Sequence, residues 1–167
     1  MYALQDTIVA ISTPPGLGAL GILRLSGPEA IAIADRVFRG ASLAQAAGHS
    51  LHYGRLMKGG AVLDEVVVSL FRAPKSYTRE DVVEISCHGS PYILREALDL
   101  LVGEGARLAE AGEFTRRAYL HGSMDLAQAE AVADLIASSS AGAHQLAMSQ
   151  LRGGVSGELK DLREQLL

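Results

Sequence analysis

Residues 112–131 read Gly-Glu-Phe-Thr-Arg-Arg-Ala-Tyr-Leu-His-Gly-Ser-Met-Asp-Leu-Ala-Gln-Ala-Glu-Ala, and they mark a change in the character of the chain. Residues 113–120 predict a short helix that ends at His121-Gly122, because glycine is common just past a helix C-terminus. A second helix follows, with Asp125 as its expected N-cap and Gln128 three residues later to complete a capping box. This stretch therefore predicts two successive helices where a helical region begins.

The chain before this stretch predicts strands mixed with helices. Gly59-Gly60 separates two β-branched segments, which is typical of a β-hairpin. Ser26 is the expected N-cap of the first helix, and Glu29 completes its capping box. Because hairpins alternate with helices, we expect an α+β domain with a mixed sheet. The predicted strands are residues 7–12, 21–26, 51–58, 62–71, 81–87 and 106–109, and the predicted helices end near residue 38 and span residues 91–102.

Beyond Leu120 the sequence is rich in alanine and predicts helices only. One helix covers about residues 126–136, and after a break at residues 138–140 another runs on from about Ala141. An apolar stripe in this last helix requires a partner helix. Because Leu167 is followed by no stop signal, we expect the helix to continue into a longer polypeptide. The stripe consists of Leu151, Val155, Leu159, Leu162 and Leu166.

The composition can build a core but offers little attraction for nucleic acid. Of the 167 residues 49% are hydrophobic, and the formal net charge is -4. Neutralising phosphates requires a basic surface, so a free-standing nucleic-acid binder is disfavoured. The first residues lack the basic segment and apolar run that we would expect of a leader peptide, and no segment approaches the roughly 18 apolar residues that a membrane span needs. Cys87 is the only cysteine. We therefore expect a cytoplasmic protein with no membrane association.

Residues 16–21 match the G-x-G-x-x-G dinucleotide fingerprint, but their context argues against that function. The fingerprint must open a helix whose N-terminus holds the pyrophosphate, whereas Gly21 leads into a predicted strand. The 167 residues contain no Gly-x-x-x-x-Gly-Lys-Ser/Thr segment, so we expect this chain not to bind GTP through a P-loop.

Two charged residues interrupt otherwise apolar predicted strands. Alternation places Arg24 and Glu84 each on the strand face opposite its apolar neighbours. One interpretation is an Arg24–Glu84 ion pair, or simple exposure on a solvated sheet face. The other is a small-molecule site, in which the carboxylate accepts two hydrogen bonds from an aminopyrimidinone edge and the guanidinium holds an anionic tail. A pterin with a glutamate tail presents both groups.

His88 and Gly89 follow the Glu84 strand and are candidates for lining the same pocket. Histidine suits proton transfer, but a histidine at a strand end is more often structural, so we assign no catalytic residue. Cys87 alternates onto the face opposite Glu84 and is expected to pack as a small hydrophobic residue. The other histidines lack a ligand spacing with carboxylates or Cys87, so we expect no metal site.

Three segments, taken together, point to one protein family. They are residues 6–27, Asp-Thr-Ile-Val-Ala-Ile-Ser-Thr-Pro-Pro-Gly-Leu-Gly-Ala-Leu-Gly-Ile-Leu-Arg-Leu-Ser-Gly; residues 76–89, Ser-Tyr-Thr-Arg-Glu-Asp-Val-Val-Glu-Ile-Ser-Cys-His-Gly; and residues 112–131, quoted above. In their order and approximate spacing they resemble the N-terminal region of the MnmE (TrmE) family of tRNA-modification GTPases. The resemblance covers nearly the whole chain.

This resemblance implies a tetrahydrofolate-binding domain of the aminomethyltransferase type at residues 1–120, followed by the start of an α-helical domain at residues 121–167. Arg24 and Glu84 match positions that contact folate in the family. Ser123 stands where the family usually has a lysine or arginine, and its hydroxyl keeps hydrogen bonding but loses the charge. The implied cofactor is 5-formyl- or methylene-tetrahydrofolate.

The resemblance also implies an activity and partners for the whole protein. Such proteins form homodimers and work with the partner protein MnmG (GidA). They use a folate one-carbon donor and GTP hydrolysis to install a carboxymethylaminomethyl or aminomethyl group at C5 of the wobble uridine of tRNA. GTP, Mg²⁺ and K⁺ are expected only in a G domain outside these residues, and this segment would bind and orient the folate. Two alternatives remain open: a stand-alone folate-dependent one-carbon transferase, and a structural dimerisation module without a ligand.

Overall fold

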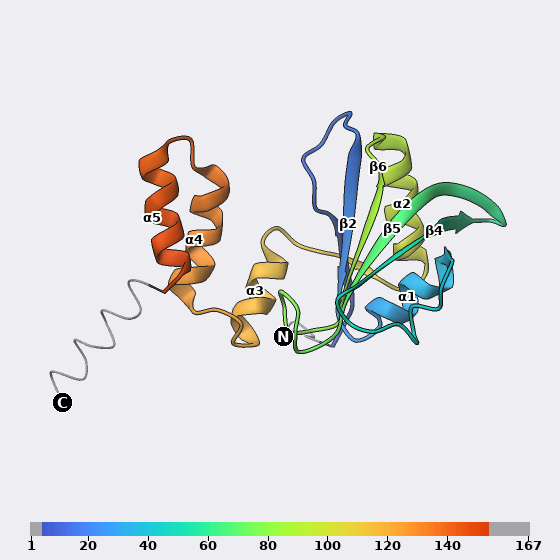
Figure 1. Ribbon diagram of the computed structural model, residues 1–167, viewed down its shortest axis with the longest axis horizontal. Coiled ribbons are helices and arrows are strands. Elements are labelled where there is room, and N and C mark those ends of the chain that lie inside the picture. The colour runs from blue at the N-terminus through green and yellow to red at the C-terminus, as the bar shows by residue number, and fades with distance from the viewer. Residues whose placement is uncertain (1–4, 154–167) are drawn as a thin grey trace, which may run out of the picture. The chain divides into compact units, whose positions relative to one another are not determined.

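The computed structural model describes residues 5–153 (Figure 1). The chain divides into two compact units between Phe114 and Thr115, inside helix α3 (Glu113–Leu120). The functional domain boundary after Leu120 stays a prediction.

The described part of the first unit contains a mixed sheet of seven strands (Figure 1). The strand order is β3-β4-β5-β6-β2-β1-β7, in which β1 and β7 are parallel and the other neighbours are antiparallel. The predicted α+β class with a mixed sheet is thereby confirmed. The strands are β1 (Ile8–Ile11), β2 (Leu20–Ser26), β3 (Phe38–Arg39), β4 (Ser50–Lys58), β5 (Ala61–Phe71), β6 (Val82–His88) and β7 (Arg107–Leu108).

Helices α1 (Ala30–Val37) and α2 (Pro91–Gly103) pack on one face of this sheet (Figure 1). Alternate strand residues face these helices and are buried, including Leu23 and Leu25 of β2 and Val83, Ile85 and Cys87 of β6. The predicted alternation is confirmed, and it leaves the opposite strand positions on a face that α1 and α2 do not cover. We call this the open face; its residues are Leu20, Ile22, Arg24, Leu51, Tyr53, Glu65, Val67, Ser69, Glu84, Ser86 and His88.

The β4–β5 hairpin turns at Gly59-Gly60 as predicted. The two glycines have φ values of +57° and +84°, the left-handed conformations that a two-residue hairpin turn requires. Gly21 lies within β2, so the G-x-G-x-x-G pattern leads into a strand, as its context predicts. The loop before it, residues 12–19, is joined to the end of β6, because Gly18 N donates to Gly89 O at 3.0 Å and Gly89 N donates to Ala19 O at 3.1 Å.

The predicted capping box of the first helix is wrong. Ser26 lies in β2 opposite Val82, not at the helix start. Its buried hydroxyl contacts Thr78 Oγ1 at 2.6 Å and donates to Glu80 Oε2 at 2.6 Å. Because Ser26 belongs to the sheet, the helix begins later, with Glu29 as an N-cap that makes no side-chain cap hydrogen bond.

The second unit contains the rest of α3 and two further helices, α4 (Leu126–Ala137) and α5 (Ala141–Leu151). The capping box of α4 is confirmed: Asp125 Oδ1 accepts from Gln128 N, and Gln128 Oε1 accepts from Asp125 N, both at 2.9 Å. Helix α5 does not run on as predicted, because the chain turns at Gly153 with φ +82°. The stripe residues 155–166 lie outside the described residues. Within residues 5–153, no helix is both long and apolar enough to cross a membrane.

Replacing Thr7 by valine should destabilise the first unit, because it removes the acceptor of the Glu29 N–H at the start of α1. Thr7 is 4% exposed, and its Oγ1 accepts from Glu29 N at 2.9 Å. We expect Thr7→Val to lower the free energy of unfolding by about 1 kcal/mol, as for a hydrogen bond that loses one of its partners. Thr7→Ser keeps the hydroxyl and should lose clearly less. Equal stability of the valine variant and the parent in urea unfolding would contradict this role.

Candidate functional site

Arg24 and Glu84 lie directly opposite each other on the neighbouring strands β2 and β6. Arg24 Nε donates to Glu84 Oε1 at 2.8 Å, and Nη2 lies 2.7 Å from the same oxygen. Their side chains are 30% and 24% exposed, so the pair is shielded without being buried. The ion pair anticipated from the alternation is present. Since both contacts use Oε1, Oε2 of Glu84 is left to accept hydrogen bonds from a ligand.

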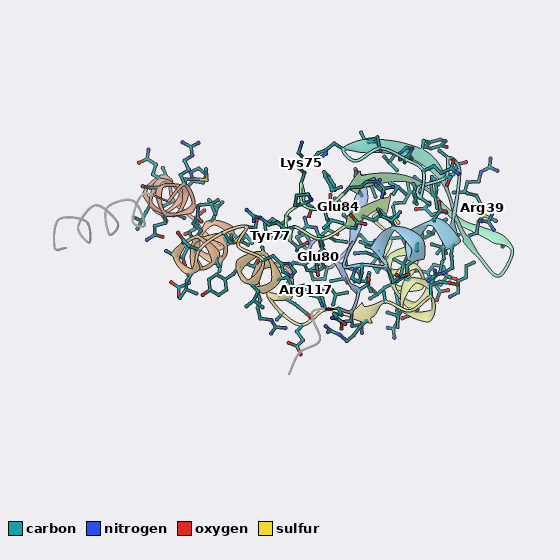
Figure 2. All side chains as sticks on the ribbon, turned by 90° about the horizontal axis from the view of Figure 1, so that it is seen from below. Arg39, Lys75, Tyr77, Glu80, Glu84 and Arg117 are labelled. Carbon is teal, nitrogen blue, oxygen red and sulfur yellow. The ribbon has the colours of Figure 1, made fainter. Side chains whose placement is uncertain are left out.

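Two aromatic rings flank the Arg24 guanidinium. Its central carbon lies 5.6 Å from the ring centroid of Tyr77 and 5.7 Å from that of Phe114, within the range of cation–π attraction. Figure 2 shows Tyr77 and Glu84 in the same part of the molecule. Sequence reasoning did not single out either ring, although both lie in segments that resemble the family. Tyr77 lies in a loop and Phe114 lies at a helix end, where no periodic pattern in the sequence predicts the direction of a side chain.

His88 lies at the end of β6 and is held by a buried carboxylate. Its Nδ1 lies 2.6 Å from Asp64 Oδ1, and its backbone N donates to Asp64 Oδ2 at 2.8 Å. The Asp64 side chain is 7% exposed, whereas that of His88 is 67% exposed. Sequence reasoning missed Asp64, although a signal existed: it occupies an inward position in the alternation of β5, where an unpaired carboxylate is unfavourable.

A cavity of about 480 Å³ opens beside His88. Its walls are formed largely by open-face residues of β2, β4, β5 and β6. The lining residues are Leu20, Tyr53, Glu65, Val66, Val67, Ser86, Cys87 and His88. His88 therefore lines a pocket, but Arg24 and Glu84 do not appear in this lining.

The other two predicted site residues have different surroundings. Gly89 is buried and lies so close to Gly18 and Leu20 that an added Cβ would collide with their backbone atoms. Packing alone therefore requires a glycine at this position. Ser123 follows α3 in the second unit, where the residue is exposed and its N donates to Ala118 O at 2.8 Å.

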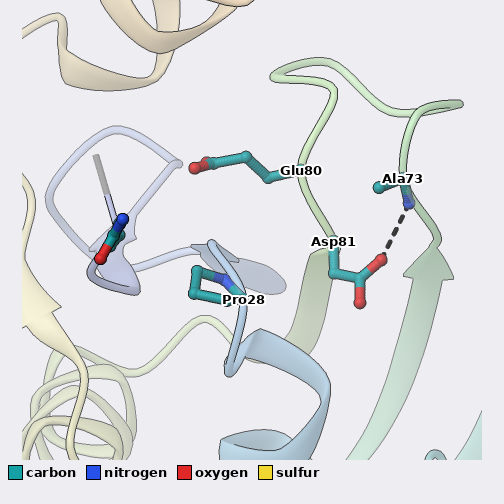
Figure 3. Close-up of a pocket in the computed structure, with 5 residues that line it drawn as sticks. Pro28, Ala73, Glu80 and Asp81 are labelled. Atoms are coloured by element: carbon teal, nitrogen blue, oxygen red, sulfur yellow. Dashed lines mark hydrogen bonds between the residues drawn. The ribbon is translucent and has the colours of Figure 1, made fainter.

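A further cavity, of about 520 Å³, lies between the start of α1 and the loop before β6. Figure 3 shows the Glu80 side chain extending toward Pro28, and Asp81 accepting a hydrogen bond from Ala73 N. Glu80 also accepts from Ser26 Oγ, so this carboxylate helps to hold the loop against β2. Gln5 completes the lining.

Cys87 has the buried environment that its alternation predicts. It is 1% exposed and belongs to the core between the sheet and the helices. Burial, together with the negative charge of Asp64, raises the pKa of its thiol to about 12. The thiol is therefore protonated at neutral pH and cannot act as a nucleophile.

Comparison with known proteins agrees with this fold and sequence. The family model described as "GTP-binding protein TrmE N-terminus" matches residues 7–123. Similar proteins include the tRNA modification GTPases MnmE of Bacteroides thetaiotaomicron, 59% identical over 167 residues, and of Cytophaga hutchinsonii, 56% identical over 162 residues. That of Flavobacterium johnsoniae is 52% identical over 166 residues. These alignments cover 97–98% of this chain but only 35–36% of each relative.

An α+β domain with a mixed sheet, followed by helices, is thus the architecture of a region that the family model describes as the N-terminus of a GTP-binding protein. The chain belongs to the TrmE (MnmE) family of tRNA-modification GTPases and corresponds to the N-terminal region of its members. It spans about a third of the length of the curated relatives it matches.

Cys87 should resist thiol reagents as long as the protein stays folded. With a pKa near 12 instead of the ordinary 9.0, its thiolate fraction at pH 8 is about a thousandfold smaller than that of an exposed thiol. We expect reaction with Ellman's reagent at pH 8 to be at least a hundredfold slower in buffer than in denaturant. Equal rates in the two conditions would mean that the thiol is exposed.

Proposed function

We propose that this chain binds a tetrahydrofolate derivative, 5-formyl- or methylene-tetrahydrofolate, at Arg24 and Glu84 on the open face. The observation that carries this proposal is the shielded ion pair on two neighbouring strands, with Tyr77 and Phe114 beside it. A carboxylate, a guanidinium and two aromatic rings suit the three parts of a folate: its donor edge, its anionic tail and its flat rings.

Ligand binding at this pair proceeds by exchange of partners. The 2-amino-4-oxo edge of a pterin carries two parallel N–H groups, the same pattern that a guanidinium presents to a carboxylate. A pterin can therefore take the place of Arg24 on Glu84, using Oε1 and Oε2. Arg24, released from Oε1, then meets the anionic glutamate tail. Since the two side chains touch, a rearrangement must accompany binding if they are to hold different parts of one ligand.

The low cost of this exchange supports the proposal. Partly exposed ion pairs contribute about 0–1 kcal/mol to stability, so separating Arg24 from Glu84 demands little free energy. Tyr77 and Phe114 remain as surfaces on which a pteridine or benzoyl ring can stack. Ser123 is proposed as a further, uncharged contact for the ligand tail.

The whole protein is proposed to act in tRNA modification with a folate one-carbon donor. The names of the relatives support a GTPase that modifies tRNA. We infer that it installs a carboxymethylaminomethyl or aminomethyl group at C5 of the wobble uridine, together with MnmG in the cytoplasm. GTP, Mg²⁺ and K⁺ would bind in a G domain outside these 167 residues, and the role of this segment is to hold the folate.

Calorimetric titration with 5-formyltetrahydrofolate tests the proposed ligand. We expect saturable binding to the parent chain and an affinity about 10- to 100-fold lower for Glu84→Gln, because hydrogen bonds to a charged group contribute about 1.5–3 kcal/mol. Glu104→Gln is the matched control: Glu104 also pairs with an arginine, Arg36, at 2.8 Å, but it lies outside the open face. Its affinity should equal that of the parent.

Each other outcome selects an alternative. No binding by the parent favours a structural module without a ligand. Unchanged affinity of Glu84→Gln removes Glu84 from the site. Turnover of a folate one-carbon donor by this chain alone favours the stand-alone transferase.

We further propose that the open face takes part in a homodimer. Leu20, Leu51 and Tyr53 are 68%, 72% and 68% exposed, and Val67 beside them is 38% exposed. Large apolar side chains gathered on one sheet face are typical of a protein–protein contact. A second copy of this chain that contacts Leu51 and the outer edge of Tyr53 would cover part of this apolar surface and leave the ion pair and the cavity beside His88 accessible to ligands.

The dimer proposal predicts that a charge on this face separates the subunits. We expect sedimentation velocity to show a dimer for the parent and mainly monomer for Leu51→Lys, because an interface core excludes unpaired charges. Leu108→Lys is a control, since Leu108 is 54% exposed on β7, at the edge of the sheet. A Leu51→Lys variant that dimerises like the parent would place the interface elsewhere.

A further inference from the structure

Asp64 and His88 form a pair that neither the family match nor the proposed folate contacts explain. The Asp64 carboxylate accepts three hydrogen bonds: from Glu65 N at 2.9 Å, from His88 N at 2.8 Å and from the His88 ring at 2.6 Å. Asp64 is only 8% exposed. A buried carboxylate that binds both the backbone and the ring of one histidine fixes the orientation of that ring.

The pair also determines which ring nitrogen carries the proton. An ionised carboxylate can only accept, so Nδ1 of His88 must be the donor to Asp64. In the neutral ring Nε2 is then unprotonated, and the side chain is 67% exposed. A histidine with Nδ1–H held by a buried carboxylate and a free Nε2 has the arrangement of a general base, whose imidazolium the carboxylate stabilises after proton uptake.

The adjoining cavity offers hydrogen-bond acceptors and a negative charge. Glu65 lines it and accepts from the Tyr53 hydroxyl at 2.8 Å, and Ser86 contributes a hydroxyl. Arg55, 3.7 Å from Glu65 Oε1, offsets part of this charge. The apolar side chains of Leu20 and Val67 restrict the polar part of the cavity, so that it can hold only a small polar group. The carboxylates of Glu65 and of the neighbouring Asp64 together outweigh the charge of Arg55, so this half-apolar hollow favours a small cation that carries N–H groups.

We propose that this cavity binds a primary amine in its ammonium form and that His88 Nε2 removes one proton from it, with Asp64 as the positioning residue. In this step an N–H bond of the ammonium breaks, its electron pair stays on nitrogen, and the proton forms a bond with Nε2. This inference rests on the proposed function, because an aminomethyl group requires an amine nitrogen, which is nucleophilic only as the free base.

The cavity lies along the strand that carries the proposed folate contact. Glu84, Ser86 and His88 occupy alternate positions of β6 and therefore share the open face. At about 3.3 Å per residue, His88 lies about 13 Å from Glu84 along the strand, with Ser86 between them. An amine in the cavity would thus share the open face with a ligand whose donor edge is held at Glu84, about 13 Å along the strand.

NMR of the 167-residue chain with ¹⁵N label tests the amine site directly. Imidazole spectra should show His88 in the Nδ1–H form. Methylammonium chloride should shift the His88 ring and Ser86 amide signals in a saturable way, whereas tetramethylammonium chloride, which has no N–H group, should not. The ring of His144, in the second unit, serves as the internal reference.

Variants separate the amine site from general salt effects. Glu65→Gln should weaken the methylammonium response at Ser86 several-fold, Glu104→Gln should leave it unchanged, and His88→Gln should abolish it. Asp64→Asn should lose the Nδ1–H preference of His88; if this variant does not fold, His88→Gln alone decides. A response that is absent, or equal for the two salts, or retained in His88→Gln, overturns the inference.

The folate titration tests the proposed function separately from the amine site. A parent that binds methylammonium but no folate would contradict the proposed function and leave the amine site standing. A parent that binds folate but does not respond to methylammonium would contradict only the amine site.

Discussion

The register between β2 and β6 determines where every candidate side chain lies. The pairing runs from Leu20 opposite His88 to Ser26 opposite Val82, without a bulge. Because side chains alternate along a strand, this register sends Leu23 and Ile85 toward the helices and Arg24 and Glu84 to the open face. A shift by one residue would exchange the two faces and bury two charges. Burial of the apolar side chains against α1 and α2 therefore also holds the ion pair in place.

The two-residue periodicity of the strands predicted much of this placement of side chains. Alternation in β2 and β6 gave the faces of Arg24, Glu84 and Cys87, and the glycine pair gave the hairpin turn. The wrong helix cap at Ser26 and the site residues that were missed share a physical cause: a partner distant in sequence. The hydroxyl of Ser26 suits a helix cap, but pairing with Val82 keeps it in the sheet. The rings beside Arg24 and the carboxylate beneath His88 likewise depend on tertiary contacts that no local pattern encodes.

The open face combines features that stability alone would not require. An ion pair whose side chains are 30% and 24% exposed adds little to folding, and exposed apolar residues nearby add nothing until they are covered. Both features suit a surface completed by other molecules, a ligand at the charges and a protein over the apolar residues. The tRNA modification GTPases that the chain matches are about three times longer than the chain itself.

The loop between β1 and β2 is anchored at its end and exposed at its tip. At its end, Gly18 is joined to Gly89 next to His88, whereas Leu17 is 90% exposed and a side chain at Gly16 would meet no atom within 4 Å. Exposed tips of this kind tolerate insertions. A fluorophore attached at position 17 through an introduced cysteine would therefore leave the fold intact. Because the same loop is anchored beside the cavity, the emission of the fluorophore would report when a ligand occupies the cavity, without a label inside it.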